Sequence, residues 1–192
     1  MKRYNIMKLQ KKLQKELDED RYCHTLGVMY TSAALAMRYG EDMEKAQVAG
    51  LLHDCAKCIP NEKKKKLCEK YKIPVTQVEE GAPFLLHAKL GAYLAKTKYN
   101  VSDPEILQAI TWHTTGKPDM TLLEKIVFLA DYIEPARCRA AHLHEIRDIA
   151  FVDIDQAVYM TLRDTLRYLE SGIGAVDEMT KSAYVYYKEL CS

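Results

Sequence analysis

Apolar residues recur at intervals of three and four along nearly the whole chain, and alternation with a period of two is almost absent. Because an α-helix turns once every 3.6 residues, this spacing is typical of helices that bury one face. The sequence therefore predicts an all-α fold class. The helices are expected over residues 2–17, 21–39, 43–55, 84–96, 102–113, 121–133, 139–149, 153–170 and 177–190, with a short charged helix beginning at residue 61.

Two helix starts carry a recognisable capping pattern. Ser102 and Glu105 have the spacing of a capping box, in which each side chain bonds the other residue's backbone N–H, and Thr121 and Glu124 repeat it. The chain has no internal repeat, low-complexity tract or linker that would separate two domains. We therefore expect residues 1–192 to form a single domain.

The charged residues are nearly balanced, with 28 Lys and Arg against 27 Asp and Glu in 192 residues. A net charge of +1 does not provide the broad positive field that nucleic-acid binding requires, so a small molecule is the expected partner. The basic N-terminus lacks the apolar segment of a secretory signal, and no apolar run approaches the roughly 20 residues that span a bilayer. We expect a cytoplasmic protein with no membrane partner.

The six cysteines are scattered without a repeating spacing, which favours free thiols in a cytoplasmic protein. Cys55 and Cys58 form one CxxC, which could be a redox dithiol or part of a zinc knuckle. No second CxxC accompanies it, and no strand precedes it. We therefore expect its thiols to take no part in the chemistry.

Six ionisable side chains lie on helical faces that are otherwise apolar or small. They are His24, His53, Asp54, His87, His113 and Asp131. A single histidine on such a face is more often a hydrogen-bonded core residue, but that interpretation does not account for six groups from five helices. Beside His53, small residues including Gly50 would let another helix approach closely. His142 and His144 alternate rather than share a face and are expected at the surface.

The two carboxylates need a compensating positive charge, because burying an isolated carboxylate costs several kcal/mol, and few Lys or Arg share their faces. A metal centre would supply that charge. Four histidines and two aspartates, without cysteine, make a nitrogen and oxygen ligand set that suits iron, manganese or zinc. The sequence therefore predicts a buried metal site.

The ordered set His24, His53–Asp54, His87, His113, Asp131 resembles the HD superfamily of metal-dependent phosphohydrolases. More narrowly, the segments RYCHTLGV, LLHDCAK, LLHAKLGA, HTTG and DYIEPAR look like the bacterial symmetrical diadenosine tetraphosphate hydrolases. The resemblance implies a helical HD domain with a metal-binding core at 21–135, an N-terminal helix within 1–20 and C-terminal helices in 136–192. It also implies a binuclear metal centre, with iron as the expected metal.

The resemblance assigns roles to particular residues. His24, His53, Asp54 and Asp131 would hold the first metal, and Asp54 would bridge to a second metal held by His87 and His113. Asp54, His53 and Asp131 would be the catalytic residues. The substrate would contact His24, His87, His113, Asp131, Arg137, Lys57, Thr114, Gly174, Ala175 and Val176.

The expected reaction is hydrolysis of diadenosine tetraphosphate into two ADP by hydroxide formed at the metals. Lys57, Lys89 and Arg137 are candidates to neutralise the phosphates that do not react. The turn at Thr114 could bring hydroxyl and N–H groups to phosphate, or simply end a helix. Two alternatives stay open: an HD phosphohydrolase of another nucleotide, either a nucleoside monophosphate or a cyclic dinucleotide, and a nucleotide sensor without turnover. A homodimer is one possible assembly.

Overall fold

The computed structural model describes residues 4–172 and 176–192, and these residues form helices and no strand. The predicted all-α fold class is confirmed. The elements are α1 (Ile6–Leu13), α2 (Glu19–Tyr39), α3 (Met43–Leu52), α4 (Asn61–Lys70), α5 (Gln77–Gly81), the 3-10 helix η1 (Pro83–Leu86), α6 (His87–Thr97), α7 (Pro104–Trp112), α8 (Leu122–Ile133), α9 (Leu143–Ala150), α10 (Ile154–Ser171) and α11 (Glu178–Leu190).

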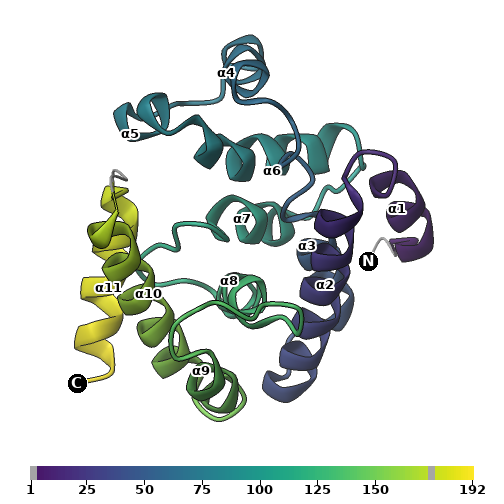
Figure 1. The fold of residues 1–192 in the computed structure, drawn as a ribbon. Helices are drawn as coiled ribbons and strands as arrows, with labels where there is room; N and C mark the ends of the chain where they lie inside the picture. Colours follow the sequence, from purple (N-terminus) through teal and green to yellow (C-terminus); the bar gives the residue numbers. More distant parts are fainter. Residues whose placement is uncertain (1–3, 173–175) are drawn as a thin grey trace.

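Helices α7 and α8 lie in the middle of the molecule, with α2 and α3 on one side and α10 and α11 on the other (Figure 1). Helix α6 packs on α7 and, together with α4 and α5, covers one end. Each central helix and its neighbours contribute wholly buried apolar side chains to one continuous core, among them Val28, Leu51, Ile110, Val127 and Leu162. None of the helices in the described part of the chain has the length and apolar character that crossing a membrane requires.

Of the two expected capping boxes, only the second forms. Thr121 accepts the N–H of Glu124, whose carboxylate accepts the N–H of Thr121 in return. At α7 the expectation for Ser102 was wrong, because Asp103 is the capping residue and accepts the N–H of Glu105. A proline at the first helical position fixes the preceding residue in an extended conformation, which makes that residue the cap.

Several helix boundaries also differ from the prediction. Helix α1 is shorter than 2–17, because Asn5 caps its start and the chain turns after Leu13. Helix α9 begins at Leu143 rather than at residue 139. Helix α5 and η1 occupy a stretch that had no predicted helix, since five- and four-residue elements are too short to show a helical period.

Helices α2 and α3 approach each other closely at a glycine. A Cβ placed on Gly50 of α3 would lie 2.7 Å from Ser32 Oγ and 3.1 Å from the Val28 carbonyl oxygen and Met29 Cα, all on α2. The prediction that small residues beside His53 let another helix approach is confirmed. This contact fixes the position of the C-terminal end of α3. The next two residues, His53 and Asp54, are buried in the interior.

We expect Gly50→Ala to destabilise the protein by about 1–3 kcal/mol, because backbone atoms of α2 would have to move to admit the methyl group. Gly81→Ala is the matched control, since a Cβ there meets nothing within 4 Å and the residue also lies in a helix. Chemical unfolding curves of both variants check the expectation. Equal stability of the two variants would contradict it.

Candidate metal centre

The structure brings together all six predicted ligand residues, although they lie far apart in the sequence. His24 lies on α2 and Asp131 on α8, while His87 is the first residue of α6 and His113 directly follows α7. Helix α3 ends at Leu52, earlier than the predicted residue 55, so His53 and Asp54 stand in the turn that follows it. All six except His24 and Asp131 are buried.

Asp54 stands between two groups of imidazole rings. Its Oδ2 atom lies 3.5 Å from His53 Nε2 and 4.0 Å from His24 Nε2. Its Oδ1 atom lies 3.1 Å from His87 Nε2 and 3.6 Å from His113 Nε2. The two oxygens of one carboxylate therefore face different pairs of histidines.

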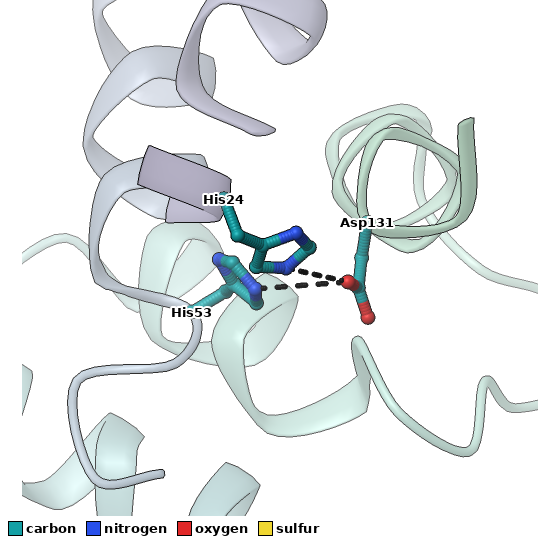
Figure 2. Close-up of side chains that lie close together, drawn as sticks. All are labelled: His24, His53 and Asp131. Carbon is teal, nitrogen blue, oxygen red and sulfur yellow. Dashed lines mark ion pairs between the residues drawn. The ribbon is translucent and has the colours of Figure 1, made fainter. Parts of the chain in front are cut away.

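Asp131 closes the first of these groups (Figure 2). Its Oδ1 atom lies 3.0 Å from His24 Nε2 and 3.9 Å from His53 Nε2. The Asp131 side chain is 24% exposed and that of His24 is 11% exposed, so the cluster reaches solvent at this edge.

Hydrogen bonds at Nδ1 fix the orientation of three of the rings. A backbone carbonyl only accepts, so a ring bonded to it carries its proton on Nδ1 and presents an Nε2 lone pair to the cluster. The partners and distances are Gly50 O for His53 (2.7 Å), Phe84 O for His87 (2.6 Å) and Ile110 O for His113 (2.7 Å).

Three buried polar atoms at the centre of the cluster have no hydrogen-bond partner in the described part of the chain: His24 Nε2, His53 Nε2 and Asp54 Oδ1. Leaving such atoms unsatisfied costs free energy, so their convergence fits a site that binds a ligand. Potential ligand atoms lie within 4.8 Å of one another in two groups, His24–His53–Asp131 and His53–Asp54–His113. These nitrogen and oxygen donors fit a divalent metal ion.

The charge states also favour cation binding. Burial raises the pKa of Asp54, but the electrostatic effect of His53 and the other surrounding histidines outweighs burial and holds that pKa well below its usual value. Burial lowers the pKa of His87 to about 4, against the opposing effect of Asp54. Near pH 7 the carboxylate is therefore ionised and His87 is neutral, which are the states that bind a metal.

Few Lys or Arg share the helical faces of these carboxylates, but the fold brings cations to them from elsewhere. Arg21 Nη1 bonds Asp54 Oδ2 at 2.8 Å, and Arg137 Nη2 bonds Asp131 Oδ1 at 2.9 Å. Lys57 Nζ lies 3.8 Å from Asp54 Oδ1 and 3.3 Å from His87 Nε2. Sequence reasoning missed Arg21, although residues three apart share a helical face and Arg21 precedes His24 by that interval on α2.

Thr114 lies where the cluster meets a cavity of about 460 Å³. Its Oγ1 atom is 3.1 Å from His87 Nε2 and 3.0 Å from His113 Nε2, and Trp112 also lines the cavity. Lys89 lines it too, but its ammonium group pairs with Glu79 at 2.8 Å rather than pointing at the histidines. A second hollow of about 660 Å³ borders His24 on the other side of the cluster.

The C-terminal turn is described only in part. Gly174 and Ala175 lie outside the described residues, so the structure does not place them. Val176 is half-buried and precedes Asp177, which lines the cavity that contains Thr114. The substrate contacts expected of this turn stay a prediction.

All six cysteines are free, as predicted, and the CxxC pair points in two directions. The Cys55 thiol is buried and donates to Gly91 O, whereas the exposed Cys58 thiol donates to the Asp18 carboxylate. Burial raises the pKa of Cys55 to about 12, so it stays protonated. His142 and His144 are exposed, as predicted, and His142 Nδ1 lies 2.9 Å from the buried carboxylate of Asp164.

The chain is similar to known proteins over most of its length. The chain is 42% identical over 157 residues to the Bacillus subtilis protein named bis(5'-nucleosyl)-tetraphosphatase, symmetrical, covering 82% of this chain and 83% of the relative. A Staphylococcus aureus protein of the same name is 35% identical over 167 residues, covering 86% of this chain and 85% of the relative.

A crystal structure from Clostridium acetobutylicum, described as a predicted HD superfamily hydrolase involved in NAD metabolism, superposes with a TM-score of 0.93. That protein is 38% identical, and the match covers 98% of this chain and 100% of the other. The HD domain model matches residues 21–136, which contain all six clustered histidines and aspartates. The chain therefore belongs to the HD domain family.

Proposed function

We propose that this protein is a metal-dependent hydrolase that cleaves diadenosine tetraphosphate symmetrically into two ADP. The observation that carries the proposal is the placement of Asp54, whose two oxygens face two separate groups of histidine Nε2 atoms. The identity of 35–42%, over more than 80% of the chain, to relatives named symmetrical bis(5'-nucleosyl)-tetraphosphatases supports the choice of substrate.

The proposed cofactor is a binuclear metal centre, with iron as the expected metal and manganese or zinc as alternatives. His24, His53, Asp54 and Asp131 would hold one ion, and Asp54, His87 and His113 the other. Bound divalent ions would neutralise phosphate charge and make a water molecule nucleophilic near neutral pH. The chain's own contribution is to hold six ligands in place, with the Nε2 lone pairs of His53, His87 and His113 aimed inward.

Three cations around the centre suit a polyphosphate. Arg21 and Arg137 lie on the side of His24 and Asp131, and Lys57 lies on the side of His87. In the present structure they neutralise Asp54 and Asp131, and substrate phosphates would compete for them. The planar fork of Arg137, 41% exposed, can bind two phosphate oxygens at once.

The cavity at Thr114 would receive a nucleoside of the substrate. Its volume of about 460 Å³ suits a small ligand, and Trp112 offers an aromatic ring for a base. Gly174, Ala175 and Val176 would contact the same nucleotide. We further propose that residues 1–192 form one HD domain, and that the protein is cytoplasmic and assembles as a homodimer.

The first prediction concerns the products. Metal-loaded protein should convert diadenosine tetraphosphate to ADP alone, resolved by anion-exchange chromatography. NAD, a nucleoside monophosphate and a cyclic dinucleotide should be turned over far more slowly in the same assay. Formation of ATP plus AMP would contradict symmetrical cleavage, and tight binding of intact dinucleotide without turnover would favour a sensor.

The second prediction concerns metal removal. Chelation should abolish hydrolysis, and it should lower the free energy of unfolding by about 2.7 kcal/mol relative to protein at a metal concentration 100 times the Kd. Calorimetry with and without metal measures the stability difference, and elemental analysis should find two ions per chain. Full activity in chelated protein with no bound metal would exclude a metal-dependent reaction.

The third prediction concerns Asp54. Asp54→Asn removes the charge shared by both proposed metal positions and should reduce turnover by more than about 100-fold. This loss is larger than the loss typical of mutating a residue that only orients a metal ligand. Asp164→Asn is the matched control, because Asp164 is an equally buried aspartate that pairs with His142 and Arg163 away from the cluster. Near-normal turnover by Asp54→Asn with metal bound would refute the bridging role.

A further inference from the structure

We propose that Glu134 is a positioning residue, which orients the His24 ring and so sets the affinity of the metal position formed by His24, His53 and Asp131. The inference rests on the proposed metal-dependent function and adds a residue outside the ligand set. It was not apparent from the sequence, where Glu134 is one of many glutamates and follows the end of a predicted helix.

His24 differs from the other three histidines in what holds its ring. Those three donate Nδ1–H to a carbonyl within their own segment, whereas His24 Nδ1 lies 3.1 Å from Glu134 Oε1 on the segment that follows α8. A carboxylate only accepts, so His24 carries its proton on Nδ1 and presents the lone pair of Nε2 to the cluster. The carboxylate charge also makes Nε2 a stronger ligand.

The chain holds the Glu134 carboxylate in place from several directions. Glu134 is 2% exposed, and its Oε2 atom accepts the N–H of Ala136 at 2.7 Å. Arg147 of α9 donates to the backbone carbonyls of Ile133, Glu134 and Arg137, at 2.7–2.9 Å. The side chain and the backbone at this point are therefore both fixed.

Helix α2 leaves room for this carboxylate at one position. A Cβ placed on Gly27 would lie 2.5 Å from Glu134 Oε2. Gly27 follows His24 by three residues, so the two share the face of α2 that meets Glu134. Glycine in the middle of a helix is unfavourable, and the close approach of the carboxylate gives a reason for it here.

Among the residues that the structure describes, no lysine or arginine side chain forms an ion pair with the Glu134 carboxylate. Within the described residues, its one ion pair is with His24. A buried carboxylate whose ion-pair partner is an imidazole needs further positive charge nearby, and a metal ion on the far side of that ring would provide it. The burial of Glu134 therefore points to a cation at His24 Nε2.

Metal affinity, measured by competition with a chelator, tests the role separately from activity. In Glu134→Gln we expect one of the two ions to bind about 10- to 100-fold more weakly, while the affinity for the other stays as in the wild type. Glu124→Gln is the matched control, because Glu124 lies in the first turn of α8 and is equally buried but bonds Thr121 and Lys117 instead of a histidine. It should bind both ions normally.

Two further variants separate positioning from a purely structural role. Gly27→Ala keeps the carboxylate but displaces it, and should weaken the same ion as Glu134→Gln. In a His24→Ala background, adding Glu134→Gln should cause no additional loss of metal affinity, because Glu134 acts through His24. An additional loss would show that it acts by another route and would overturn the proposal.

The proposal would also be overturned if Glu134→Gln lowered only the melting temperature and bound both ions like the wild type, since Glu134 would then be no more than an anchor for the loop after α8. Failure of the proposed function looks different. Wild-type protein that binds two ions but forms ATP plus AMP would contradict the proposed reaction and leave the role of Glu134 intact.

Discussion

A single buried carboxylate, that of Asp54, is the constraint on which the arrangement of the central helices depends. An ionised group in an apolar interior needs cations or hydrogen-bond donors around it. Here Arg21 of α2 donates to the carboxylate, and four histidine Nε2 atoms surround it at distances of 3.1–4.0 Å. The histidines are His24 on α2, His53 in the turn after α3, His87 on α6 and His113 after α7. Helix packing brings them within reach, and the tight contact of α3 on α2 at Gly50 sets where the carboxylate stands.

The two sides of the cluster differ, although the proposed substrate is symmetrical. One side has Thr114 and a cavity that Trp112 helps to line, while the other has Arg21 and Arg137 beside a more open hollow. A dinucleotide cleaved at its centre would place one half in each environment. The equal products would then result from where the polyphosphate crosses the cluster, and would not require two equal binding sites.

The sequence predicted the members of this cluster because their neighbours on the predicted helices are apolar, although His53, Asp54 and His113 prove to lie in the turns that follow α3 and α7. It also predicted the capping box at Thr121, where both partners are local. The predicted cap at Ser102 was wrong, because the proline moves the cap to Asp103. The sequence also did not reveal the contact of Glu134 with His24 or that of Arg21 with Asp54. Those two contacts join segments distant in sequence, so no local pattern reveals them.

The Nδ1 bonds of His53 and His113 have an effect on the helices as well as on the rings. The last carbonyls of a helix have no partner within it, and Gly50 O and Ile110 O are such carbonyls in α3 and α7. Each histidine therefore donates its Nδ1–H to a carbonyl in the last turn of the helix that it follows, while its Nε2 atom faces the cluster. A metal ion bound at Nε2 would restrain the ring and, through its Nδ1 bond, the last turn of the helix. Metal binding should therefore reduce fraying at the C-terminal ends of α3 and α7.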